Sequence, residues 1–335
     1  MNVLILGGVG FIGRNLVKYL VDHQPDTNIK VLDKVLLATS FLSAEHKAAF
    51  DSPNVTVKQA NLSSPKSIEA NFEGKPWDVV VNLAAETKFG QTEEVYKEKV
   101  LDVAVKCAAE AKKIGCRKWI EVSTAQVYQA AKGKKPSTEE SPLEPWTKLA
   151  KYKLGVEEHL KGTGLDYSVI RAAIVHGPGD VSGLAPRIII GAVYKKLNDK
   201  QKNLWTAGLS LNTVHVEDVC CAIVESMKWP SGATYNLVDE NKTDQGTINK
   251  HLEELFGIKT GFYGAMASKV AETLALSALA AEANDKHLKP WSDLCREQGI
   301  ASTPLSPYID QELLSNNNLF VSGEAIKKTG FKYAH

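Results

Sequence analysis

Three glycines near the amino terminus stand at a spacing that suits phosphate binding. They are Gly7, Gly10 and Gly13, and Gly8 with the last two also satisfies the pattern G-x-G-x-x-G. Between a strand and a helix, such glycines allow a tight turn and bring the backbone close to a pyrophosphate. The helix that follows would present unpaired N–H groups to the phosphates. This stretch predicts a dinucleotide site, with Phe11 and Ile12 in its first helical turn.

A carboxylate follows at the distance that a ribose contact requires. Asp33 ends the second apolar stretch, twenty residues after Gly13. At that place a carboxylate accepts hydrogen bonds from the adenosine ribose hydroxyls and repels a 2′-phosphate, which favours NAD. Lys34 comes directly after it and could attract such a phosphate, so NADP stays possible.

The rest of the first half has the elements that such a site needs. Helical patterns alternate with six short apolar stretches: Val3–Leu6, Ile29–Leu32, Val55–Lys58, Val79–Leu83, Trp119–Val122 and Tyr167–Ile170. Stretches that are nearly continuously apolar are typical of parallel strands buried on both faces. The pattern predicts an α/β fold, with a Rossmann-type doubly wound parallel sheet over residues 1–175. Residues 176–335 are expected to form a smaller, mostly helical substrate-binding region, with some strands that return to the main sheet.

Composition excludes several other classes of protein. The chain has 335 residues, 44% of them hydrophobic, and a formal net charge of +1, so no nucleic-acid partner is expected. Its five cysteines are odd in number and scattered, which predicts neither a disulfide framework nor a metal site and favours a cytoplasmic location. No run of 18 apolar residues occurs, so no membrane insertion is expected.

Further motifs resemble the extended short-chain dehydrogenase/reductase family, which includes sugar-nucleotide epimerases, dehydratases and 3β-hydroxysteroid dehydrogenases. They are GGVGFIG at 7–13, ANLSS at 60–64, VVNLAAE at 80–86, VSTAQVY at 122–128, KLGVEE at 153–158, RAAIVHGPGD at 171–180 and HVEDV at 215–219. The resemblance implies an NAD(P)-binding oxidoreductase, epimerase or dehydratase that acts on an alcohol or ketone group of a small molecule. It also implies a homodimer that pairs through two long helices, Val95–Ile114 and Leu149–Lys161.

The resemblance carries over to individual residues. The cofactor-binding residues that it implies are Asn61, Leu62, Leu83, Ala84, Ala85, Ser123, Ala173 and Ile174. Thr124 falls at the catalytic Ser/Thr of the family. Lys153 falls at the lysine whose ammonium bonds the nicotinamide ribose and lowers the pKa of a catalytic tyrosine.

Departures from the family pattern occur in three places, all near the expected catalytic residues. The tyrosine expected four residues before Lys153 is Leu149. Lys99 stands where the family has an asparagine. Ile174 replaces a second asparagine, and His176 replaces a tyrosine two residues later. A leucine supplies no proton, whereas a positioned acid or base contributes about 10²–10⁴-fold to such a reaction.

Other side chains could replace the missing phenol. Tyr128 is the candidate that we assign to catalysis, because it belongs to a loop that we expect over the site. Tyr152 and His176 are weaker candidates. Tyr128 and Lys132 also match Tyr-x-x-x-Lys, but Gly133 and Pro136 follow, and a loop does not place residues four apart on one face.

Three functions stay open on the sequence alone. The first is an NAD-dependent enzyme with a relocated acid–base. The second is a pseudoenzyme that senses the cofactor or binds a partner without turnover. The third is non-redox isomerase or lyase chemistry, with Lys153 or Lys99 as the base, where repulsion between the two ammonium groups would favour the neutral amine.

Overall fold

A seven-stranded parallel sheet forms the centre of the molecule. The structure, a computed structural model, describes residues 1–73, 76–131, 133 and 135–335. The strand order is β10-β6-β5-β4-β1-β2-β3. The strands are β1 Asn2–Leu6, β2 Asn28–Asp33, β3 Val55–Gln59, β4 Val79–Asn82, β5 Lys118–Thr124, β6 Tyr167–Ala172 and β10 Ala233–Leu237. All six predicted strands are present, and the Rossmann-type doubly wound sheet is confirmed.

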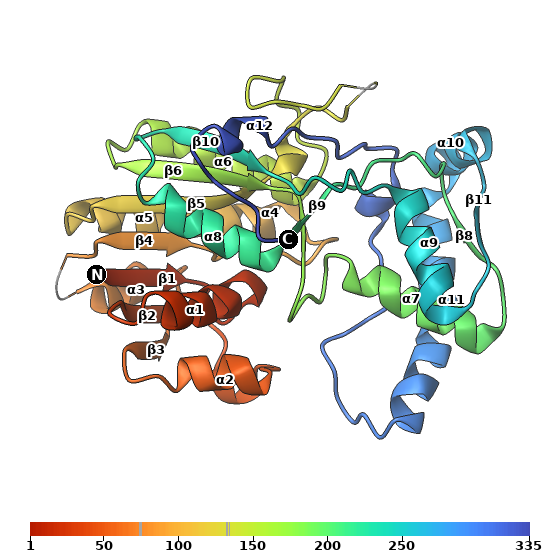
Figure 1. The fold of residues 1–335 in the computed structure, drawn as a ribbon, viewed down its shortest axis with the longest axis horizontal. Helices are drawn as coiled ribbons and strands as arrows, with labels where there is room; N and C mark the ends of the chain where they lie inside the picture. Colours follow the sequence, from red (N-terminus) through yellow and green to blue (C-terminus); the bar gives the residue numbers. More distant parts are fainter. Residues whose placement is uncertain (74–75, 132, 134) are drawn as a thin grey trace.

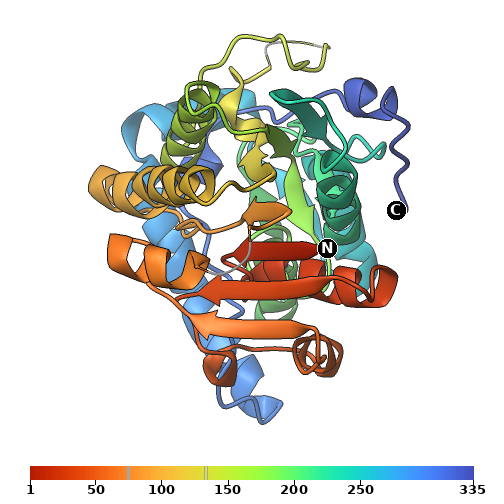
Figure 2. The same ribbon diagram turned by 90° about the vertical axis from the view of Figure 1, so that its left-hand side faces the viewer.

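Helices cover both faces of this sheet (Figure 2). On one side lie α1 (Phe11–His23), α2 (Ala44–Phe50) and α8 (Val216–Ser226); on the other lie α3 (Pro65–Phe72), α5 (Val103–Lys113) and α6 (Lys148–Lys161). β1 shows why its sequence is continuously apolar. Val3 and Ile5 point into one core layer, Leu4 and Leu6 into the other, and all four are fully buried.

One predicted long helix contains an irregular turn. It begins as α4 (Glu93–Tyr96), passes through a π-helical turn (Lys97–Asp102) and continues as α5. Such turns are common at functional sites. Lys99 lies within this one.

A largely helical region extends beyond the carboxyl ends of the strands (Figure 1). It contains α7 (Ala185–Leu197), α9 (Gln245–Phe256), α10 (Ala265–Leu274), α11 (Leu276–Glu297) and a small pair of strands, β8 (Gln201–Asn203) and β11 (Thr260–Phe262). A second pair, β7 (Ile174–His176) and β9 (Thr213–His215), borders the main sheet. Among the described residues, no helix is both long and apolar enough to cross a membrane.

The expectation that residues 176–335 are mostly helical is wrong after Glu297, where α11 ends. There the chain runs mostly without regular structure, apart from a 3₁₀ turn (Gln311–Leu314) and α12 (Glu324–Lys327). Pro304 and Pro307 explain this, because proline lacks the N–H that a helix requires.

Candidate active site

A wide cleft lies between the carboxyl ends of the strands and the C-terminal region. Its volume is about 1950 Å³. Single-ligand pockets usually measure about 300–1,000 Å³, so this cleft has room for two ligands. Its lining includes the glycine-rich turn beside the sheet, and α7, α11 and the segment around residues 303–315 from the C-terminal region.

The glycine-rich turn depends on the absence of side chains at two positions. Gly7 has φ +74°, and a Cβ there would lie 2.8 Å from the backbone of Ala84. A Cβ on Gly13 would lie 2.4 Å from the Cα of Gly8, so the helix could not pack at this distance with any larger residue. Gly10 is the N-cap of α1 and offers no side-chain hydrogen bond. The first N–H groups of α1 are therefore available to an anion in the cleft.

Asp33 fastens the end of β2 to this turn. One carboxylate oxygen accepts from the backbone N–H of Val9, at 2.9 Å, and the other from that of Val35, at 2.9 Å. The carboxylate also lines the cleft, where each oxygen keeps capacity for another hydrogen bond. Lys34 is exposed, and its Nζ lies 3.7 Å from a carboxylate oxygen of Glu86.

Arg14, which sequence reasoning missed, braces the same turn. Its guanidinium donates to the carbonyl of Val9, at 2.9 Å, and to that of Phe41 beyond β2, at 2.7 Å. Burial lowers the pKa of Arg14, and the nearby Asp33 opposes that shift. The result is a fixed cation beside the glycine-rich turn, at the end of the cleft where phosphates would lie.

The candidate catalytic residues meet where β5 ends and α6 begins. Thr124 lines the cleft, and its hydroxyl oxygen accepts from the N–H of Gln126, at 3.2 Å, which caps a 3₁₀ turn. Thr147 caps α6 by accepting from the N–H of Ala150, at 3.1 Å. Leu149, in the first turn of that helix, also lines the cleft. The helix predicted around Lys153 is therefore present, with its leucine facing the site.

Lys153 is bound to the sheet beneath the cleft. Its ammonium donates to a carboxylate oxygen of Glu121, at 3.0 Å, and to the carbonyl of Val122, at 2.8 Å. Glu121 is fully buried within β5 and also accepts from Asn82, at 2.7 Å, and from Trp119, at 3.3 Å. The ammonium therefore compensates a buried carboxylate, although Lys153 still lines the cleft.

Lys99 does not face Lys153 as the base hypothesis requires. Its ammonium lies 2.6 Å from a carboxylate oxygen of Glu98 and 3.3 Å from the hydroxyl of Ser63. Each of the two lysines therefore pairs with its own carboxylate, and the contacts do not bring the two ammonium groups together.

A second buried network of hydrogen bonds explains why Tyr128 does not line the cleft. Glu157 of α6 accepts from Ser123 and from the guanidinium of Arg171, the latter at 2.6 Å. Arg171 also donates to the hydroxyl of Tyr128, at 2.7 Å, and that hydroxyl donates to Asn236 of β10, at 2.7 Å. Tyr128 is 2% exposed and does not line the cleft, and burial raises its pKa to about 12. The expectation that Tyr128 lies over the site does not hold, because its phenol joins Arg171 of β6 to Asn236 of β10.

The other substitutes for the phenol also point elsewhere. Tyr152 donates to Glu93, at 2.6 Å, and is not among the cleft residues. His176 does not line the cleft either, and its ring packs edge-on against His215. Tyr128 follows a 3₁₀ turn and lies in extended structure, so no helix relates it to Lys132, which lies outside the described residues.

Arg187 is a second residue that sequence reasoning missed, and its helical surroundings gave no signal for it. It lies in the first turn of α7, lines the cleft and is partly buried. No hydrogen bond or ion pair joins its guanidinium to another described residue, and burial lowers its pKa to about 10. The adjacent N–H groups are already satisfied, since Asp180 accepts from residues 182–185. An unpaired cation in the lining of the cleft suits an anionic ligand.

The cleft brings together nearly all the residues that the sequence assigned to a site. Those that line it are Gly7, Gly10, Phe11, Ile12, Gly13, Asp33, Lys34, Asn61, Leu62, Leu83, Ala84, Ala85, Ser123, Thr124, Lys153 and Ile174. Ala173 does not, because it is buried and its N–H donates to the carbonyl of Leu237 in β10, at 2.9 Å.

Comparisons with known proteins all point to one family. The profile of the NAD dependent epimerase/dehydratase family matches residues 3–237. The dTDP-glucose 4,6-dehydratase of Haemophilus influenzae is 31% identical over 159 residues, which are 43% of this chain and 46% of that protein. A trifunctional UDP-glucose 4,6-dehydratase/epimerase/reductase of Arabidopsis thaliana is 25% identical over 272 residues, 76% of this chain and 39% of that protein. The chain spans between 39% and 63% of the length of the first curated relatives that it matches.

Solved structures with the same fold include enzymes of this kind. The dTDP-glucose 4,6-dehydratase of Bacillus anthracis, in complex with NAD, has a TM-score of 0.66 at 24% identity, covering 79% of this chain and 85% of that one. The UDP-glucose 4-epimerase of Thermus thermophilus, also in complex with NAD, has a TM-score of 0.65 at 21% identity, covering 79% and 86%.

Proposed function

Because the chain belongs to the NAD dependent epimerase/dehydratase family, we propose that it binds NAD in the cleft and uses it on an alcohol or ketone carbon of a small molecule. The observation that most supports this is the glycine-rich turn, with Asp33 bound to it, at one end of a cleft large enough for two ligands. The carboxylate in the ribose position favours NAD over NADP. Within the same proposal, the protein is a cytoplasmic homodimer that pairs through α5 and α6, which its mass in solution would test.

The chain supplies the positioning for this chemistry. The nicotinamide, when bound, accepts or donates the hydride. The hydroxyl oxygen of Thr124 already accepts a hydrogen bond, so its O–H is free to donate to a substrate oxygen, where charge develops as hydride moves. Leu149 and Trp146 line the same part of the cleft with apolar surface, which excludes water from the reacting carbon.

A second candidate is a protein that binds the cofactor without turnover. One observation favours it: Tyr128, Tyr152, Lys153 and His176 each have partners away from the substrate position. An acid or base is then lacking at the carbon that exchanges hydride. Replacing Leu149 by tyrosine restores the phenol, and its effect on the rate distinguishes the two candidate functions.

Replacing Leu149 by tyrosine is expected to raise the rate of NADH formation at least 100-fold, because a positioned acid or base contributes about 10²–10⁴-fold. Leu149 faces the cleft one turn before Lys153, so the new hydroxyl would stand over the substrate position. The rate would be measured on a panel of UDP-linked and dTDP-linked sugars, the substrates for which several relatives are named. Leu149→Phe is the control, since it adds the ring without the hydroxyl. A wild-type protein that is already fast, and slower as Leu149→Tyr, would contradict this and show that the acid–base has been relocated.

Arg187 indicates that the substrate carries an anionic group. We expect Arg187→Met to weaken the binding of uridine diphosphate about 10–100-fold, since a charge-assisted hydrogen bond contributes about 1.5–3 kcal/mol. NAD binding should change less, because Arg187 belongs to α7 and not to the glycine-rich turn. Both affinities would be measured by calorimetry. Lys88→Met is the matched control, since Lys88 also lines the cleft but is exposed to water. Equal diphosphate affinity in Arg187→Met and the wild type would exclude this role.

A further inference from the structure

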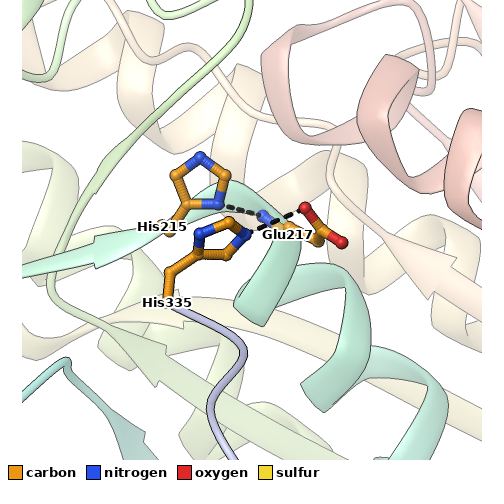
Figure 3. Close-up of side chains that lie close together, drawn as sticks. All are labelled: His215, Glu217 and His335. Carbon is orange, nitrogen blue, oxygen red and sulfur yellow. Dashed lines mark hydrogen bonds and ion pairs between the residues drawn. The ribbon is translucent and has the colours of Figure 1, made fainter.

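Two imidazoles and a carboxylate meet where β9 leads into α8 (Figure 3). His215 ends β9, Glu217 lies in the first turn of α8, and His335 comes from the C-terminal segment. None of the three lines the cleft. The family chemistry therefore does not account for their convergence.

The three groups lie within reach of a single ion. One ligand atom from each residue lies within 4.8 Å of the other two. The Nε2 of His335 is 3.0 Å from a carboxylate oxygen of Glu217, and the ring centroids of His215 and His335 are 3.9 Å apart. Figure 3 shows the two imidazoles one above the other, with the Glu217 side chain beside them.

The C-terminal segment is held in this position independently of His335. The N–H of Ala334 donates to Asp218, at 2.6 Å, and the hydroxyl of Tyr333 accepts from the N–H of Val238, at 3.4 Å. Phe331 is 6% exposed and belongs to the core. The backbone that carries His335 is therefore held beside α8 before any ion binds.

Asp218 is an independent sign that a cation belongs here. It is fully buried, and its second carboxylate oxygen has no hydrogen-bond partner among the described residues. A buried, half-satisfied carboxylate is costly, and a neighbouring cation would reduce that cost.

We propose that His215, Glu217 and His335 bind a zinc ion, with water in the fourth position. Two imidazole nitrogens and one carboxylate oxygen are ligands that zinc takes in tetrahedral sites. Metal–ligand distances of about 2.0–2.2 Å place tetrahedral ligand atoms roughly 3.4 Å apart. Glu217 and His335 are exposed, so their side chains can rotate toward a shared ion. The Nδ1 of His215 accepts from the N–H of Glu217, at 3.3 Å, and would exchange that hydrogen bond for the ion.

The ion would join the C-terminal segment to the border of the cleft. His215 pairs in register with His176 of β7, and Ile174 and Val175 of the same strand line the cleft. The site thus has a structural role beside the cleft and does not depend on the proposed reaction.

Titration of the full chain with zinc chloride, without NAD, tests the site. We expect one equivalent to bind, and the affinity to fall at least about 10-fold in His335→Ala and in Glu217→Gln, as loss of even an outer ligand contact does elsewhere. His251→Ala is the control: His251 is an exposed imidazole 3.5 Å from Glu254 on α9, and it should leave the affinity unchanged. Zinc should also raise the melting temperature of the wild type but not of His335→Ala.

Two results would overturn the proposal. One is equal zinc affinity in the wild type and His335→Ala, which would make the contact between His335 and Glu217 an ordinary surface ion pair. The other is zinc binding that disappears in a variant without Cys221 but persists without His335.

Discussion

Replacing Gly10 by aspartate is expected to abolish NAD binding while leaving the protein folded. Gly10 is the N-cap of α1 and has φ −64° and ψ 179°, which any residue adopts. A Cβ there would meet only the carbonyl oxygen of Gly7, at 3.2 Å. Aspartate is also a favoured N-cap, so the melting temperature should not fall. Its carboxylate, however, would stand beside the pyrophosphate and occupy the N–H groups that should bind it.

The expected loss of affinity is large. Two like charges 4 Å apart repel by about 4 kcal/mol at an effective dielectric constant of 20, which corresponds to roughly 10³-fold in the dissociation constant. Calorimetric titration with NAD measures the loss, and thermal melting confirms the fold.

Gly10→Asn separates charge from bulk, because asparagine has nearly the same shape and is also a favoured N-cap. It should bind NAD more tightly than Gly10→Asp does. Equal losses in the two variants would attribute the effect to size alone. An aspartate variant that binds NAD like the wild type would show that the dinucleotide does not lie at this turn.

The features that the sequence predicted well are those set by neighbouring residues. β1 is recognisable because residues 3–6 are all apolar and are buried on both faces of the sheet. The glycine-rich turn and Asp33 are likewise local, since the tight turn and the close helix need glycine at fixed offsets. The segment after Glu297 was misjudged because its order comes from isolated bridges to residues distant in the chain, which join residue 319 to 211 and residue 321 to 137.

The candidate catalytic residues could not be placed in the same way. The partner of the Tyr128 hydroxyl, Asn236, is 108 residues away in the chain, and no local pattern indicates it. For Lys153 there was a signal, because Glu121 interrupts the apolar strand Lys118–Thr124. A carboxylate on a strand that is covered on both faces of the sheet requires a cation or several hydrogen-bond donors. Glu121 therefore predicts a partner without identifying it.

The buried ion pair of Lys153 and Glu121 is expected to contribute strongly to the stability of the fold. Lys153→Met is expected to lower the free energy of unfolding by about 3–5 kcal/mol, because it leaves the Glu121 carboxylate buried without its cation. Glu121 would keep only its hydrogen bonds from Asn82 and Trp119. Urea denaturation measures the loss. Lys161→Met is the matched control on the same helix, since Lys161 pairs with Glu158 at the surface and should contribute less than about 1 kcal/mol.

A double-mutant cycle shows whether Lys153 acts through Glu121 or through the cofactor. Glu121→Gln removes the charge but keeps an oxygen that accepts hydrogen bonds. If the lysine mainly compensates the carboxylate, Lys153→Met combined with Glu121→Gln should be more stable than Lys153→Met alone, by 1 kcal/mol or more. NAD affinity, measured on the same proteins, then reports any contact with the cofactor separately. A Lys153→Met protein of normal stability and weakened NAD binding would mean that the ammonium leaves Glu121 for the nicotinamide ribose, as the family resemblance implies.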